Sequence, residues 1–204
     1  MKTKSILLVP ALIILFSAAN GQKNNSDTSF RRYFVGTSGF MLFNLAPNPP
    51  SFYQLNFGYW LTKKDVLSIE AKTWRYNYPL GVPFGDDFDT PQWEYPGYIK
   101  EYGIGLAYQR YLWRGLYTAI HAAGFRQRYV DNDGNKIQNG FQLFMTGRLG
   151  YHVRLFKDRF FIEPSIAVTH WPINTNTPES FAKLERSWPN YFLFEPGLHL
   201  GLKF

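Results

Sequence analysis

Hydrophobic and polar residues alternate with a period of two along much of this chain. Toward its end, every second residue from Leu198 to Phe204 is large and hydrophobic, and the residues between them are His199, Gly201 and Lys203. Only a β-strand separates a two-residue period into two faces, so this stretch predicts a strand with one apolar face. The same alternation predicts strands over eight segments, at residues 33–44, 52–62, 66–76, 98–113, 116–130, 137–156, 159–171 and 190–204.

The connections between these segments are alternately short and long. Short turns on one side and long loops on the other are typical of transmembrane barrels, whose turns are periplasmic and whose loops face outward. We therefore predict an all-β fold, an eight-stranded antiparallel up-and-down transmembrane β-barrel, over residues 33–204. The short connections are Lys63–Asp65, Arg114–Gly115 and Lys157–Asp158, and the long ones are residues 45–51, 77–97, 131–136 and 172–189.

Turn length fixes which residues face each other across a hairpin. A two-residue turn at Lys157–Asp158 sets His152 opposite Glu163 and Arg148 opposite Ala167. The other face of this segment is hydrophobic, so the polar face is predicted to line the lumen of the barrel.

The hairpin at Arg114–Gly115 is less clear from its pattern. A two-residue turn there would set Glu101 opposite Arg128 and Gly103 opposite Arg126, which sends both arginines into the lumen. The same register sends His121, Phe125 and Tyr129 outward, although the imidazole of His121 is unfavourable on a face toward lipid.

The hairpin at Lys63–Asp65 needs a turn with an odd number of residues, and three is preferred. Only an odd length keeps Glu70 and Lys72 on the lumen face with the polar residues of the preceding segment. The inward residues of that segment are then Gln54, Asn56 and Trp60, and the outward ones are Tyr53, Leu55, Phe57 and Tyr59.

The predicted lumen holds acidic and basic side chains together. Eight strands enclose an interior that side chains roughly fill, and an isolated charge there would be costly to desolvate. We expect opposite charges to pair and to plug the lumen; the alternative is an ion path gated by the same pairs. The candidate residues are Glu70, Lys72, Glu101, Arg126, Arg128, Arg148, His152, Glu163, Glu195 and His199, with Arg154 beside them.

The N-terminus has the pattern of a secretory signal peptide. Lys2 and Lys4 precede an apolar run at residues 6–16 and small residues at 17–21, and the run is too short to span a bilayer as a helix. We expect residues 1–21 to be a signal peptide, cleaved between Ala19 and Gln22, and residues 22–32 to be a disordered periplasmic lead-in.

Composition excludes several other classes of protein. A mean hydropathy of −0.28 excludes a bundle of helices in lipid but fits a barrel wall whose two faces alternate. The chain has no Cys, which excludes disulfides, thiol chemistry and a lipoprotein attachment site. The formal charge of +7 falls to +5 without the two signal lysines (7 − 2), and no basic run exceeds Arg31–Arg32, so binding of nucleic acid is unsupported.

Candidate ligand chemistry lies in the loops. Asp86, Asp87, Asp89 and Trp93 could bind an extracellular cation or sugar, although an acidic, solvated loop is the favoured interpretation. Residues 131–135 lack the glycine and glutamate spacing of a calcium loop and are interpreted as a turn, and no metal or cofactor is expected.

No residues are arranged for catalysis. Ser165 and His170 lie on opposite faces of one predicted strand, and no nucleophile elbow occurs, so enzymatic activity is not expected. Two Glu-Pro pairs, Glu163–Pro164 and Glu195–Pro196, predict local bulges, because each proline removes a donor from the strand ladder. Glu163 could also face His199 across the last two strands.

These features together resemble the small eight-stranded outer-membrane barrel proteins, the porin-like or OmpX-like group, and the last two strands resemble barrels of the Bacteroidetes. The resemblance implies a place in the outer membrane of a Gram-negative bacterium, contact with its lipid, and a monomer. It also implies that the terminal strand, with Leu200, Leu202 and Phe204, is recognised by the barrel-assembly machinery.

Members of this group serve in adhesion, envelope integrity or passage of small solutes, and no catalytic residues can be carried over. Our first hypothesis is a non-enzymatic barrel that acts in envelope structure or surface interaction through its outer loops. A narrow pore for ions or small solutes is the alternative, and a lipid-modifying enzyme is the second. A soluble lipocalin-like barrel would instead place its apolar faces inside.

Overall fold

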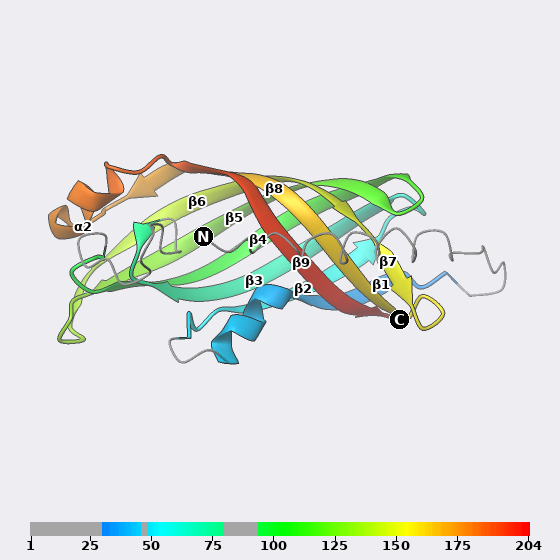
Figure 1. The fold of residues 1–204 in the computed structure, drawn as a ribbon, viewed down its shortest axis with the longest axis horizontal. Coiled ribbons are helices and arrows are strands. Elements are labelled where there is room, and N and C mark those ends of the chain that lie inside the picture. Colours follow the sequence, from blue (N-terminus) through cyan, green and yellow to red (C-terminus); the bar gives the residue numbers. More distant parts are fainter. Residues whose placement is uncertain (1–29, 46–48, 80–93) are drawn as a thin grey trace, which may run out of the picture.

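The computed structural model describes residues 30–45, 49–79 and 94–204. In these residues one antiparallel sheet has the strand order β6-β5-β4-β3-β2-β1-β9-β8-β7, and pairing of β6 with β8 closes it into a barrel (Figure 1). β6 and β7 are one strand interrupted at His152, so the ring confirms the predicted all-β, up-and-down fold. The elements are β1 (Tyr33–Ser38), η1 (Gly39–Leu45), β2 (Tyr53–Trp60), β3 (Asp65–Tyr76), β4 (Tyr98–Trp113), β5 (Leu116–Val130), β6 (Lys136–Tyr151), β7 (Val153–Leu155), β8 (Phe160–Thr175), α2 (Glu179–Glu185) and β9 (Tyr191–Lys203).

The barrel has two unlike ends. One, on the right in Figure 1, carries the short turns and the end of β9, and we call it the turn end. The other carries α2 and the longer connections, and we call it the loop end. The predicted signal peptide (residues 1–21) and residues 22–29 of the lead-in lie outside the described residues.

The register predicted from the turn at Lys157–Asp158 is confirmed. Arg154 pairs with Phe161 and Arg148 with Ala167, and the same count sets His152 opposite Glu163. The chain reverses through three left-handed residues, because the backbone φ angles of Phe156, Lys157 and Asp158 are 49°, 58° and 61°.

The turn between β2 and β3 has three residues, as predicted, but they are residues 62–64 rather than 63–65. The amide of Leu61 donates to the carbonyl of Asp65 at 2.9 Å, and the Thr62 hydroxyl donates to the Asp65 carboxylate. The predicted faces are correct, because Asn56 pairs with Glu70 and both side chains are buried.

The register predicted for β4 and β5 is wrong beyond its first pair. Trp113 pairs with Leu116 as predicted, but Tyr111 then pairs with Tyr117, so Leu112 is an unpaired extra residue. Because side chains alternate with a period of two, this bulge reverses both faces of β5. Arg126 and Arg128 therefore point outward and are exposed, and the residues that point inward are His121, Phe125 and Tyr129.

Two further elements differ from the predicted strands. The first segment forms a strand only to Ser38 and continues as the 3-10 helix η1, and the long connection before β9 contains the helix α2. No bulge interrupts β8 at Pro164, where the register with β9 is continuous. A bulge lies just before Glu195 instead, where Phe194 has a φ of 59°.

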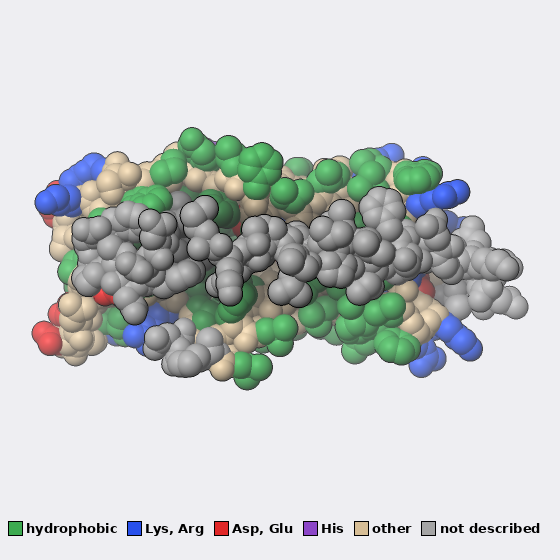
Figure 2. All heavy atoms as spheres, viewed as in Figure 1, with side chains coloured by type: hydrophobic (Ala, Val, Ile, Leu, Met, Phe, Trp, Pro, Cys, Tyr) green, Lys and Arg blue, Asp and Glu red, His purple; other side chains and the backbone are tan. Residues whose placement is uncertain are grey.

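The outer wall of the barrel is apolar. Ile104, Leu106 and Ile120 are 67%, 68% and 65% exposed, and Leu202 and Phe204 of the last strand are exposed as predicted. Figure 2 shows hydrophobic side chains along the visible flanks and Lys and Arg side chains toward both ends. Within the described residues, no helix is both long enough and apolar enough to cross a bilayer.

Candidate functional site

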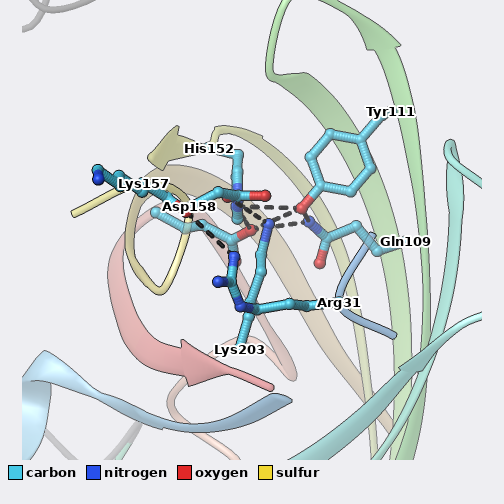
Figure 3. A network of polar contacts seen from close by, with 8 residues as sticks. Arg31, Gln109, Tyr111, His152, Lys157, Asp158 and Lys203 are labelled. Carbon is cyan, nitrogen blue, oxygen red and sulfur yellow. Dashed lines mark hydrogen bonds and ion pairs between the residues drawn. The ribbon is translucent and has the colours of Figure 1, made fainter. Parts of the chain in front are cut away.

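The lumen is the candidate site, and its side chains form three layers along the barrel axis. The layer at the turn end is centred on Glu163 of β8, which is buried. Its Oε1 accepts hydrogen bonds from Gln109 Nε2 at 3.0 Å and from the Tyr111 hydroxyl at 2.9 Å, both from β4, and lies 2.6 Å from His152 Nδ1. One carboxylate thus ties β4 to the strand pair β7–β8, and Figure 3 labels its partners Gln109, Tyr111 and His152.

A second carboxylate closes the turn end. Asp158, in the turn between β7 and β8, accepts a hydrogen bond from Lys203 Nζ of β9 at 2.9 Å and lies 3.9 Å from His152 Nε2. Burial alone would raise the pKa of Asp158, but the His152 imidazole and the Lys203 ammonium outweigh it and lower the pKa to about 2. The Lys203 ammonium also lies 4.6 Å from the ring centroid of Trp60, which stacks on Tyr111.

The middle layer contains two separate ion-paired groups. Glu70 of β3 is 2% exposed and lies 2.8 Å from Lys72 Nζ and 3.1 Å from His121 Nδ1. Across the lumen, Arg148 donates to Ser165 Oγ at 2.8 Å and pairs with Glu195 at 3.4 Å.

A small cavity separates these two groups. Its volume is about 30 Å³, room for about one water molecule. Its charged and polar lining includes Glu70, His121, Arg148, Glu163 and His199. His199 pairs in register with Glu163, as the sequence suggested.

The layer nearest the loop end contains a buried carboxylate that forms no ion pair with any residue the structure describes. Glu101 is 3% exposed and accepts hydrogen bonds from the Tyr76 hydroxyl at 2.7 Å and from Gln127 Nε2 at 2.9 Å. Gln127 in turn accepts a hydrogen bond from the Tyr129 hydroxyl at 2.8 Å. The partner predicted for Glu101 was Arg128, which the bulge in β4 turns to the outside.

A hydrophobic cap closes the loop end. Phe181 of α2 is fully buried and packs with Tyr95, Ile99 and Tyr129, which are also buried. The Tyr95 hydroxyl donates a hydrogen bond to Glu185 at the end of α2. Burial raises the pKa of the Glu185 carboxyl, an effect that the hydrogen bond from Tyr95 opposes.

Most of the predicted lumen residues are indeed brought together inside the barrel. Arg126 and Arg128 are the exceptions among the ten candidates, and Arg154 is exposed as well. Asp86, Asp87, Asp89 and Trp93 lie outside the described residues. The residues inside the barrel whose contacts the sequence did not suggest include Gln109, Tyr111, His121, Gln127 and Asp158. Of these, His121 could have been found from its poor fit to an outward face.

The geometry offers no arrangement for covalent chemistry at Ser165 and His170. Ser165 bonds to Arg148 in the lumen, whereas the exposed His170 lies 2.8 Å from the carbonyl of Asn190 through its Nδ1. Among the described residues, no group of three or more His, Asp or Glu side chains is placed to hold a metal ion.

An apolar outer wall around a polar, filled interior defines a β-barrel with the polarity of outer-membrane proteins. No family model matches the chain, and no curated protein matches its sequence. A solved structure with some likeness is CarO2 of Acinetobacter baumannii, at 10% identity and a TM-score of 0.40, over 85% of this chain and 97% of that one. A likeness this weak says nothing about function. The assignment of this chain as a β-barrel comes from its own closed ring of strands.

Proposed function

We propose that this protein is an integral outer-membrane β-barrel with a closed lumen, which acts without catalysis in envelope structure or surface interaction through its loops. The observation that carries the proposal is the distribution of polarity. Large hydrophobic side chains cover the outer wall, and ion pairs and hydrogen bonds fill the interior.

Strand length supports a place in a membrane with the loop end projecting from it. β4, β6 and β8 each contain 16 residues, or about 50 Å at ~3.3 Å per residue. With a strand tilt of roughly 40°, the barrel is about 40 Å long, whereas the apolar band of such barrels is about 25 Å tall. The excess length would carry the cap and the loops beyond the lipid, where a partner could reach them.

The closed lumen favours a structural or surface role over transport. At the turn end, Lys203, Asp158 and Trp60 fill the interior, and at the loop end Phe181 and its neighbours cover it. Desolvation of an isolated charge in so narrow a space costs several kcal/mol, so ion pairs stabilise most of the lumen charges, and two hydrogen bonds hold Glu101.

A narrow pore is the second candidate, and one observation favours it. The cavity between Glu70 and Arg148 is lined by charged groups and lies midway along the lumen, where an ion or a proton could be held in transit. A pore would require both ends of the lumen to open.

Cell fractionation tests the proposal. The protein should be recovered with outer membranes, be extracted only by detergent, and migrate differently on gels before and after boiling, as folded barrels do. Recovery in the soluble periplasmic fraction without detergent would contradict a membrane barrel and favour the lipocalin-like alternative.

A further inference from the structure

A row of basic side chains crosses the outer wall of the barrel near the loop end. Arg75 of β3 pairs in register with Lys100 of β4, and Lys100 pairs with Arg128 of β5. Arg126 lies two residues nearer the middle of the barrel on the same face of β5, and Lys136, which begins β6, pairs in register with Val130 of β5. All face outward, because they share the parity of exposed wall residues or are exposed themselves.

No ion pair in the part of the chain that the structure describes neutralises this row. Among the described residues, none of its five members lies within 4 Å of a carboxylate oxygen in an ion pair, and like charges directly opposite each other destabilise a sheet. The partial compensation comes from aromatic rings, with Arg75 4.1 Å from the centroid of Tyr98 and Lys100 Nζ 5.4 Å from that of Tyr102.

The cations also converge on common points. With the amide oriented to suit its neighbours, the oxygen of Asn139 lies 2.9 Å from Lys136 Nζ and 3.3 Å from Arg126 Nη2. Two cationic groups therefore lie close enough to share one acceptor, and an anionic group beside them could take hydrogen bonds from both.

The surface below the row is apolar. Tyr102, Ile104 and Leu106 follow Lys100 down the same face of β4 and are 49%, 67% and 68% exposed, and Phe141 of β6 is exposed beside them. From Lys100 to Leu106 the wall runs about 20 Å at ~3.3 Å per residue, comparable with the length of an acyl chain. Charge above and hydrocarbon below fit a molecule with an anionic head and apolar tails.

We propose that Arg75, Lys100, Arg126, Arg128 and Lys136 bind the phosphate headgroup of a lipid in the membrane leaflet nearest the loops. The proposal rests on the proposed membrane location. A lipid is favoured over free phosphate because the row lies on an open wall rather than in a pocket, so an ion without tails would gain nothing from the apolar surface. Bound phosphate would offset the repulsion along the row and anchor the barrel at a fixed depth.

Lipid binding to the purified protein in neutral detergent tests this, with lipid A that carries two phosphates as the probe. The variant R75Q/K100Q/R128Q should bind it on the order of a hundredfold more weakly, since each of the three basic residues near an anionic surface contributes on the order of fivefold. Native mass spectrometry would count the bound lipids. Equal binding by this variant and the wild type would overturn the proposal.

A matched control removes three basic residues at the other end of the barrel. K63Q/K64Q/R159Q changes exposed side chains of the turn end by the same total charge and should bind lipid A within about twofold of the wild type. Equal loss in both variants would mean that total charge rather than the row attracts the lipid, which would contradict the proposal.

Two further binding measurements identify the ligand, and a folding control separates failure of the lipid site from failure of the membrane barrel. Lipid A without phosphates should bind weakly, and inorganic phosphate should not displace the phosphorylated lipid; the opposite result in either arm would contradict a lipid phosphate site. Altered mobility on unboiled gels must be retained by both variants. If it is retained and lipid A does not bind the wild type, the membrane barrel stands and the lipid site fails.

Discussion

Single carboxylates join distant strands at the turn end of the lumen. Asp158 links the β7–β8 turn to Lys203 of β9, and Glu163 links β8 to Gln109 and Tyr111 of β4. The two carboxylates lie on either side of His152, which contacts both. The last strand is therefore held by its side chains as well as by its backbone ladder.

The Asp158 carboxylate should make the free energy of unfolding depend on pH in the acid range. Because its pKa is lowered to about 2, Asp158 stabilises the fold above its ordinary pKa, and this contribution is lost as the pH falls from about 4 to about 2. With allowance for its partial exposure, D158N should cost about 1–2 kcal/mol at neutral pH and nothing below about pH 2. Unfolding by urea in detergent across this pH range measures the difference, and a constant cost at every pH would contradict the assignment.

The residue contacts differ in how far sequence could predict them. The pair of His152 and Glu163 followed from a two-residue turn, because an uninterrupted hairpin carries the register of its turn along both strands. The contact of His121 with Glu70 did not, because the bulge at Leu112 has no distinct signal in an alternating strand. The misfit of an outward imidazole was the only hint.

At the scale of elements, η1 replaces the sheet where β1 stops. Phe40 packs edge-on against Phe52 and Trp74, and the Asn44 side chain both donates to and accepts from the backbone of Phe52. Since hydrophobic residues occupy consecutive positions from residue 40 to 43, the pattern could not separate this turn of helix from a strand.

The helix α2 was also beyond prediction from local pattern. It has seven residues in a long connection, too short for helical propensity to decide, and tertiary packing of Phe181 fixes it. The cap it forms is therefore a property of the folded barrel and not of the segment alone.

Removal of the Phe181 ring should open the cap and leave the barrel intact. The ring lies 5.0 Å from Tyr95 and 5.2 Å from Tyr129, and loss of a buried phenyl group costs about 3 kcal/mol or more. Hydrogen exchange in F181A should rise at least tenfold at residues 179–185 and be unchanged in the strands. K183A, an exposed change on the same helix, is the control. Unchanged protection of α2 in F181A would show that this ring does not hold the cap.

At the scale of the whole molecule, the strand order and the two unlike ends followed from the sequence. A period of two and alternating connection lengths are local signals, and closure of eight such strands leaves little choice of topology. The sequence predicted that paired polar side chains fill the lumen, but not which residues contact each other. Each contact depends on the register of several hairpins together.

Closure of the lumen is the central claim at this scale, and single-channel recording tests it most directly. Wild-type protein, shown to be folded by its mobility on unboiled gels and inserted into a planar lipid bilayer, should give no steady conductance, because ion pairs fill the lumen and the cap covers it. Steady conductance steps in the wild type that change size in R148Q would contradict a closed lumen and show that ions pass beside Arg148.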